Sequence, residues 1–82
     1  MYTVYSLNNC VFCDKAKEFL RERNIGYKEI TYNKGRDTDL IMELVEVTKQ
    51  TSFPQIYIDG EFIGGYDELL NYNFPISFDE EF

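Results

Sequence analysis

A strand–helix–strand pattern over residues 2–32 constrains the fold of this chain more than any other feature. Residues 2–7 are rich in β-branched and aromatic side chains without polar alternation, which is typical of a strand covered on both faces. Apolar residues recur at helical spacing from Cys10 to about Asn24, and residues 27–32 then alternate as a strand does. A helical crossover between two such strands makes them parallel, with a right-handed connection. We therefore expect an α/β fold.

The second half of the chain predicts a helix, a hairpin and a last short helix. The helix runs from about residue 38 to residue 49. Its predicted buried side consists of Leu40, Ile41, Leu44, Val45 and Thr48. Asp59-Gly60 separates two short apolar runs, and Asp-Gly in that setting is a strong signal for a hairpin turn. With a short helix after Gly64-Gly65, the predicted order is β-α-β-α-β-β-α, a four-stranded mixed sheet with three helices.

The length of the chain, 82 residues, suits a single domain. We expect this domain to span residues 1–72 and residues 73–82 to form an acidic, aromatic C-terminal tail. Such termini usually fray. The alternative is that Phe74, Phe78 and Phe82 pack on the sheet or bind a partner.

The charge of the chain excludes several classes of partner. Fifteen acidic and eight basic side chains give a net charge of −7, which repels nucleic-acid phosphates and anionic membrane surfaces. No apolar run approaches the roughly 20 residues of a membrane span. Residues 1–9 lack the basic and apolar regions of an export signal. We expect a cytoplasmic protein that binds neither nucleic acid nor membrane.

Cys10 and Cys13 fall where the first predicted strand ends and the first helix begins. In a reducing compartment such a pair favours redox or metal chemistry, and a bridge that closes a loop of about four residues adds only about 2 kcal/mol of stability. A zinc site needs four ligands, and the chain has two cysteines and no histidine, so one chain cannot supply a Cys/His zinc site. We expect no bound metal and no tightly bound cofactor.

The two cysteines are expected to have different roles. A cysteine at the start of a helix faces unpaired backbone N–H groups and the positive end of the helix dipole, which favour the thiolate. Cys10 is therefore the candidate nucleophile. Cys13, one turn further in among apolar neighbours, is expected to remain a thiol and to resolve mixed disulfides. The charge of Asp14 is expected to oppose thiolate formation at either sulfur.

Three motifs together make the chain resemble a small dithiol glutaredoxin, a family with a thioredoxin-like fold. The motifs are Cys10-Val11-Phe12-Cys13, the proline at Phe53-Pro54, and Gly64-Gly65-Tyr66-Asp67, and the match covers residues 2–72. The resemblance implies a monomeric, glutathione-dependent thiol–disulfide oxidoreductase. Its substrates would be protein disulfides and glutathione mixed disulfides, with glutathione as the reducing co-substrate.

The resemblance also implies a glutathione site. The bond between Phe53 and Pro54 is expected to be cis, with the Phe53 backbone turned toward the cysteines to pair with a thiol-bearing peptide. Gly65, Tyr66 and Asp67 are expected to hold the γ-glutamyl end, because the amides of Tyr66 and Asp67 suit its α-carboxylate and the Asp67 carboxylate suits its ammonium. The glycine pair is expected to let the backbone approach the ligand.

The chain departs from the family pattern at several positions. Leu7 or Asn8, and also Thr51, stand where members often carry basic residues, which weakens the expected hold on the glycine carboxylate of glutathione. The residues that could substitute are Lys15, Lys49 and Gln50. Val11 replaces the usual proline and Phe12 the usual tyrosine, and both are expected to contact partner proteins.

Two other functions fit the same residues. The missing basic residues favour a redoxin that takes electrons from a flavoprotein such as thioredoxin reductase and supplies ribonucleotide reductase. In the other alternative, two protomers share an iron–sulfur cluster through Cys10 and glutathione and act as a cluster carrier.

Overall fold

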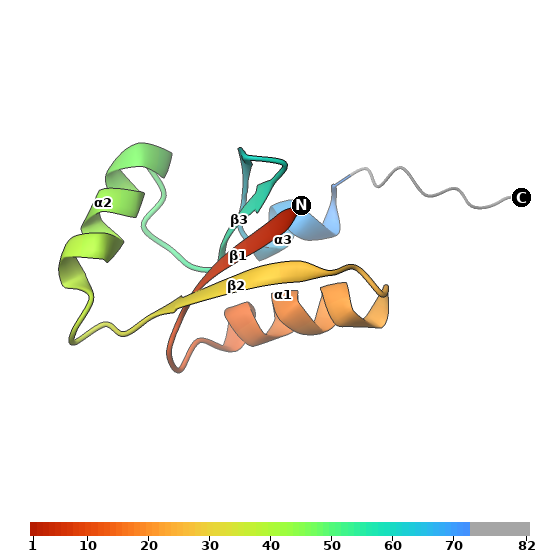
Figure 1. Cartoon of the computed structure of the whole chain (residues 1–82), viewed down its shortest axis with the longest axis horizontal. Coiled ribbons are helices and arrows are strands. Elements are labelled where there is room, and N and C mark those ends of the chain that lie inside the picture. The colour runs from red at the N-terminus through yellow and green to blue at the C-terminus, as the bar shows by residue number, and fades with distance from the viewer. Residues whose placement is uncertain (73–82) are drawn as a thin grey trace, which may run out of the picture.

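The computed structural model describes residues 1–72, and the predicted tail with Phe74, Phe78 and Phe82 lies outside the described residues. The elements follow the predicted order (Figure 1). The strands are β1 (Tyr2–Leu7), β2 (Tyr27–Tyr32), β3 (Gln55–Ile58) and β4 (Glu61–Gly64). The helices are α1 (Val11–Glu22), α2 (Thr38–Thr48) and α3 (Tyr66–Leu70). Among residues 1–72, no helix has the length and apolar character that a membrane crossing requires.

The sheet is mixed, as predicted, with the strand order β2-β1-β3-β4. β1 and β2 are parallel, with Tyr2 opposite Tyr27, because the connection between them passes through α1. β3 is antiparallel to both β1 and β4. Asp59 and Gly60 join β3 to β4 with φ angles of 52° and 83°, the left-handed conformations that a tight hairpin turn needs. The α/β prediction of four strands and three helices is confirmed.

α1 and α3 pack on the sheet and on each other, and they enclose the core. The buried members of this core are Val4, Ala16, Leu20, Ile56, Ile58 and Leu69. Ala16 and Leu20 lie four residues apart on α1 and so share one side of the helix, as the spacing of apolar residues predicts. This packing holds the start of α1, with its cysteines, against the end of β1.

A row of aromatic rings extends across the other face of the sheet. The ring centroid of Tyr5 lies 5.5 Å from that of Tyr57 and 6.1 Å from that of Tyr32. The Tyr57 and Phe62 centroids are 5.4 Å apart. Tilted and edge contacts at these separations are favourable. These four aromatic side chains thus pack against one another on this face of the sheet.

α2 stands at the end of the sheet, and the sheet does not cover it (Figure 1). The helix buries no residue completely, and Leu40 and Leu44 line a shallow hollow with Tyr5 and Tyr32. The predicted buried side was therefore wrong for Leu40, which is 47% exposed. The remaining members of that side are half-buried: Ile41, Leu44, Val45 and Thr48. Helical spacing tells which residues share a side, but the distance to the sheet depends on the long loops around the helix.

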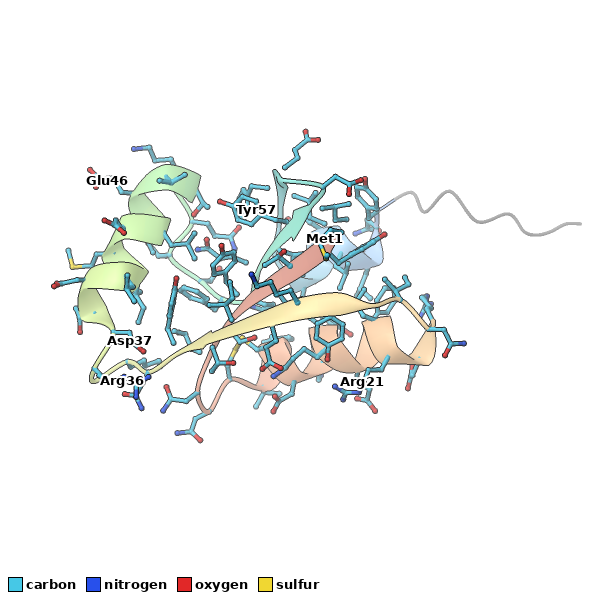
Figure 2. All side chains as sticks on the ribbon, in the orientation of Figure 1. Met1, Arg21, Arg36, Asp37, Glu46 and Tyr57 are labelled. Carbon is cyan, nitrogen blue, oxygen red and sulfur yellow. A yellow bond between two sulfur atoms is a disulfide. The ribbon has the colours of Figure 1, made fainter. Side chains whose placement is uncertain are left out.

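Charged side chains close the loop before α2. Asp37 occupies the N-cap position without a side-chain cap bond. Its carboxylate instead accepts from the backbone N–H of Asn33 at 2.8 Å and from the guanidinium of Arg36 at 3.0 Å (Figure 2). The Arg36 hydrogen bond, followed by that of Asn33, lowers the pKa of Asp37. Asp37 thus holds the loop between β2 and α2 through its hydrogen bonds with Asn33 and Arg36.

Replacing Ser6 with alanine is expected to stabilise the protein. The Ser6 side chain is buried on β1, and within residues 1–72 its hydroxyl has no hydrogen-bond partner. Burying an unpaired hydroxyl costs about 1–3 kcal/mol, so its removal should raise the free energy of unfolding by about 1 kcal/mol in a urea titration. Gln55, which is equally buried but hydrogen-bonded, is the contrast: Gln55→Leu should destabilise. A loss of stability in Ser6→Ala would show that the hydroxyl has a partner in solution.

Candidate active site

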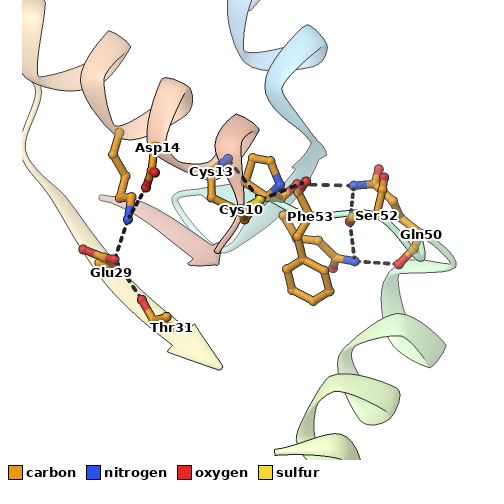
Figure 3. Close-up of a disulfide and its surroundings, with 11 residues drawn as sticks. Cys10, Cys13, Asp14, Glu29, Thr31, Gln50, Ser52 and Phe53 are labelled. Atoms are coloured by element: carbon orange, nitrogen blue, oxygen red, sulfur yellow. Dashed lines mark hydrogen bonds and ion pairs between the residues drawn. A yellow bond between two sulfur atoms is a disulfide. The ribbon is translucent and has the colours of Figure 1, made fainter. Parts of the chain in front are cut away.

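The cysteine pair sits at the junction between β1 and α1, as predicted. Asn9 turns the chain with a φ of 57°, a left-handed conformation that asparagine tolerates. Cys10 is the N-cap residue of α1 and Cys13 lies in its first turn. Their Cα atoms are 5.2 Å apart and their sulfurs form a disulfide (Figure 3). The predicted CxxC pair is thus close enough to form a disulfide within the first turn of α1.

The environments of the two sulfurs differ. The backbone N–H of Cys13 donates to Cys10 Sγ over 3.2 Å, so the cap of the helix is the Cys10 sulfur itself. Cys10 is half-buried, whereas Cys13 is only 1% exposed. An N–H donor at a helix start stabilises a thiolate, and an apolar surrounding stabilises a thiol. The roles of Cys10 in attack and Cys13 in resolution stay predictions, and the N–H contact and the difference in burial are consistent with them.

Phe53 and Pro54 bring a second chain segment to the cysteines. The peptide bond between them is cis, which confirms that prediction. The carbonyl oxygen of Phe53 lies 3.8 Å from Cys10 Sγ (Figure 3). Pro54 is buried and Phe53 half-buried. A backbone acceptor thus lies beside the half-buried Cys10 sulfur, and its pairing with a bound peptide stays a prediction.

A buried glutamine holds this segment in place. The Gln55 side chain accepts from the Thr48 hydroxyl at 2.9 Å and donates to the carbonyl of Gln50 at 2.5 Å. The side-chain amide of Gln50 donates to the carbonyls of Ser52 at 3.1 Å and Pro54 at 3.4 Å. These bonds join the end of α2 to the start of β3, so the loop beside the cysteines is fixed by polar contacts.

The glycine pair makes room for other parts of the chain, whereas it was expected to make room for a ligand. A Cβ on Gly65 would lie 3.2 Å from the Pro54 carbonyl oxygen, so this glycine lets two backbones meet. Gly64 has a φ of 123°, and a Cβ there would lie 2.5 Å from the Glu68 side chain. The Glu68 carboxylate folds back and accepts from the Gly65 N–H at 2.8 Å. The space at Gly64 is therefore taken by the side chain of Glu68 from α3, and the prediction that the pair makes room for a ligand stays a prediction.

A groove of about 350 Å³ joins these segments beside the disulfide. The predicted site residues in its lining are Phe12, Phe53, Pro54, Gly65, Tyr66 and Asp67. It is completed by Ser52 and Glu68, which sequence reasoning did not assign, and by Gln50, which it proposed only as a substitute for a cation. The predicted residues Cys10, Cys13 and Val11 do not line this groove, and Cys10 adjoins it through the Phe53 carbonyl.

Phe12 and Val11 differ in their relation to this groove. Both are exposed, Val11 to 67% and Phe12 to 53%. The Phe12 ring lines the groove, with its centroid 5.8 Å from that of Tyr66. Lys15 Nζ lies 5.2 Å from the Phe12 centroid. Contact of Val11 and Phe12 with a partner protein stays a prediction, and only Phe12 belongs to the groove.

An ion-pair network ties the helix of the cysteines to β2. Lys17 Nζ lies 2.7 Å from a carboxylate oxygen of Glu29 and 3.6 Å from one of Asp14 (Figure 3). Thr31 also donates to Glu29 at 2.8 Å. The Asp14 side chain is 78% exposed, so its charge is both paired with Lys17 and open to solvent. Both features weaken the opposition to a thiolate that Asp14 was expected to cause.

Glu29 is expected to make stability depend on pH in acid. The hydrogen bond from Lys17, followed by that from Thr31, lowers the pKa of Glu29. A carboxylate with a lowered pKa contributes stability above its unfolded pKa of about 4.3 and loses it as the pH falls through its folded pKa. Wild-type protein should therefore lose more unfolding free energy than Glu29→Gln between about pH 5 and pH 2, by about 1 kcal/mol or less.

The Lys17–Glu29 ion pair also sets the highest pH at which wild type and Glu29→Gln can be compared in this way. The hydrogen bond with Glu29 raises the pKa of Lys17, so its contribution is complete below about pH 10.4 and is lost as the pH rises through the folded value. The difference between wild type and Glu29→Gln should stay constant from pH 6 to 9 in urea titrations. A difference that also stays constant down to pH 2 would show that the ion pair does not form.

Residues 1–72 bring no three His, Cys, Asp or Glu side chains together as metal ligands. The residues proposed to replace the family's cations lie in different places. Gln50 lines the groove, Lys15 lies outside it against Phe12, and Lys49 is exposed and does not line it. Leu7, Asn8 and Thr51 contribute nothing to its lining.

Comparisons with known proteins agree with this geometry. A family model described as Glutaredoxin matches residues 2–63. Glutaredoxin 1 of Rickettsia bellii (strain RML369-C) is 34% identical over 70 residues, which is 83% of this chain and 71% of that protein. The crystal structure of glutaredoxin 1 from Francisella tularensis, complexed with cacodylate, is 31% identical with a TM-score of 0.73 over 85% of this chain and 87% of that one. A buckwheat glutaredoxin–glutathione complex is 25% identical with a TM-score of 0.72 over 85% of this chain and 64% of that one.

Proposed function

Because the chain belongs to the glutaredoxin family and is a thiol–disulfide oxidoreductase, we propose that glutathione is its reductant and that its substrates are protein disulfides and glutathione mixed disulfides. The observation that carries this proposal is the groove beside Cys10, lined by both the Phe53-Pro54 segment and the Gly65–Asp67 segment. A similar fold binds glutathione in the buckwheat protein.

With a glutathione mixed disulfide, the reaction needs Cys10 alone. The Cys10 thiolate attacks the glutathione sulfur, a new disulfide forms to Cys10, and the substrate leaves as a thiolate that takes a proton from water. A second glutathione thiolate then attacks the bound glutathione sulfur, which releases oxidised glutathione and returns the Cys10 thiolate. The Cys13 N–H, 3.2 Å from Cys10 Sγ, stabilises that anion as it leaves.

With a protein disulfide, Cys13 completes the reaction. Cys10 attacks one substrate sulfur and the other leaves as a thiol. Cys13, after loss of its proton, attacks Cys10 Sγ and breaks the mixed disulfide. The substrate sulfur that was bonded to Cys10 leaves as a thiolate and takes up a proton, so the substrate is reduced and the Cys10–Cys13 disulfide forms. Two glutathione molecules reduce that disulfide again and become oxidised glutathione. The buried position of Cys13 suits this intramolecular step.

The stabilised Cys10 sulfur favours the release steps over the first attack. A thiol whose pKa falls from about 8.5 to about 5 is almost wholly ionised at pH 7, but its nucleophilicity falls with a Brønsted coefficient of about 0.4–0.5. The two effects nearly cancel when Cys10 attacks. When Cys10 leaves, the lower pKa is an advantage. We therefore expect turnover of the glutathione mixed disulfide to be the step that this site accelerates most.

Alkylation of the reduced protein tests the state of Cys10. The rate with iodoacetamide should rise with pH through a transition well below the value of about 8.5 for a free cysteine. The chain has no histidine, so a transition between pH 5 and 8 belongs to Cys10 once the α-amino group is blocked. A transition near 8.5, with the adduct mapped to Cys10 by mass spectrometry, would contradict the proposed stabilisation.

The coupled assay with glutathione, glutathione reductase and NADPH tests the function. Purified protein should accelerate NADPH oxidation with a small glutathione mixed disulfide as substrate. Activity only when thioredoxin reductase replaces glutathione and its reductase would instead identify a redoxin that serves an acceptor such as ribonucleotide reductase. A brown protein that contains iron and inorganic sulfide and does not turn over substrate would identify a cluster carrier.

A further inference from the structure

The charges that line the groove are all negative. Asp67 and Glu68 are both exposed and contribute the only ionised side chains among its lining residues in the described part of the chain. The other polar members, Gln50 and Ser52, are neutral. A ligand in this groove therefore meets two carboxylates and no lysine or arginine.

Neither Lys15 nor Lys49 lines the groove. Lys15 Nζ lies 5.2 Å from the centroid of the Phe12 ring, and Lys15 lines a neighbouring hollow together with Glu18 and Glu22. Lys49 precedes Gln50 but does not line the groove.

Two of the neutral donors of the groove wall are already in use. The side-chain amide of Gln50 donates to the carbonyls of Ser52 and Pro54, at 3.1 and 3.4 Å. The N–H of Gly65 donates to the Glu68 carboxylate at 2.8 Å. A carboxylate of the chain itself thus occupies a place where an anionic ligand group could otherwise bind. Gln50 cannot take the role of a cation without giving up both of its contacts.

Glutathione at neutral pH carries two carboxylates and one ammonium group. Its ammonium suits Asp67 or Glu68, but neither of its carboxylates finds a cation in the lining. We infer that the groove favours thiol peptides whose carboxyl end is neutral over those that end in a carboxylate. This inference rests on the proposed function, because it concerns the ligand of the same site.

Thiol exchange measures this preference directly. The Cys13→Ser protein is equilibrated at low ionic strength with glutathione and with glutathione whose glycine carboxylate is an ethyl ester, and the two Cys10 adducts are counted by mass spectrometry. The same ratio of adducts is measured with a small uncharged thiol in place of the protein. Dividing the protein's ratio by this control ratio removes the intrinsic difference between the two peptides. The ester adduct should be favoured about two- to fivefold, the range of exposed charge pairs, and the preference should shrink in about 0.5 M salt.

Two matched variants separate the groove from the net charge of the protein. Glu68→Gln keeps an acceptor for the Gly65 N–H and removes one negative charge from the groove. Glu61→Gln removes the same charge from the exposed start of β4, which does not line the groove. Glu68→Gln should lower the preference for the ester by about half, and Glu61→Gln should leave it unchanged.

The outcomes are distinguishable. If both adducts form and glutathione is preferred or equal to its ester, the inference is wrong and the proposed function stands. If both variants change the ratio alike, the preference comes from net charge and the inference is also wrong. If neither peptide forms an adduct with Cys10, the proposed function fails and the inference fails with it.

Discussion

Replacing Cys10 with serine is expected to reduce the glutathione-coupled rate to the uncatalysed background, a loss of about 10³-fold or more. A serine hydroxyl at position 10 cannot form the mixed disulfide. The other cysteine, Cys13, is only 1% exposed, so it cannot take over the first attack. The rate is measured as NADPH oxidation at saturating glutathione. Circular dichroism and urea unfolding of the same sample show whether the fold is retained.

Cys13→Ser is the matched variant for this test. It makes the same sulfur-to-oxygen change three residues further along the chain. The first attack on a glutathione mixed disulfide and the later release of oxidised glutathione need only Cys10. The variant should keep much of its activity on glutathione mixed disulfides and lose reduction of protein disulfides, with the substrate trapped on Cys10. An active Cys10→Ser protein together with an inactive Cys13→Ser protein would reverse the two roles.

Leu20→Ala is expected to cause the largest loss of stability among simple truncations. Leu20 is completely buried on α1, in the core that joins this helix to the sheet and α3. A cavity left by a buried leucine costs about 2–5 kcal/mol. A small domain has a free energy of unfolding at the lower end of about 5–15 kcal/mol, so this change removes much of it. The midpoint of urea unfolding should fall steeply while the slope stays the same.

Leu40→Ala provides the same substitution on a helix that is not in the core. Leu40 on α2 is 47% exposed, so little apolar surface is lost and the expected cost is below about 1 kcal/mol. Equal losses at positions 20 and 40 would mean that α2 packs in solution as closely as α1. The comparison therefore tests the packing of α2 as well as the core.

The parts of the fold that local patterns specify were predictable. Residues 27–32 form β2 as predicted, and Asp59-Gly60 makes the expected turn, because alternation and turn chemistry depend on near neighbours. The exposure of Leu40 was not predictable in this way. It depends on where the loops on either side of α2 place the helix relative to Tyr5 and Tyr32, and these are contacts between distant parts of the chain.

The candidate site shows the same division. Cys10, Pro54 and Gly65 belong to short motifs; Pro54 and Gly65 line the groove, and Cys10 lies against the Phe53 carbonyl beside it. The network around Gln55 was missed because its partners are two backbone carbonyls and the Thr48 hydroxyl at the end of another element, and such contacts carry no signature in sequence. A polar residue at the start of the apolar segment 55–58 was the available signal.

Glu68 was missed although its spacing was informative. It stands three residues after Gly65, the N-cap of α3, which is the spacing of a glutamate in a capping box. Attention to that spacing would have placed a carboxylate on the Gly65 N–H before the structure was known. It would also have shown that part of the groove's capacity for anions is used by the chain itself.

The hydrogen bonds around Gln55 have a consequence for local stability. α2 buries no residue completely, so the bonds from Thr48 to Gln55 and from Gln55 to Gln50 carry much of its attachment to the rest of the chain. Segments held in this way open more readily than the core and exchange their amide protons sooner. Because Gln50 and Ser52 belong both to this tether and to the wall of the groove, excursions of α2 would loosen that wall, and an occupant of the groove would slow amide exchange in a helix that it does not touch.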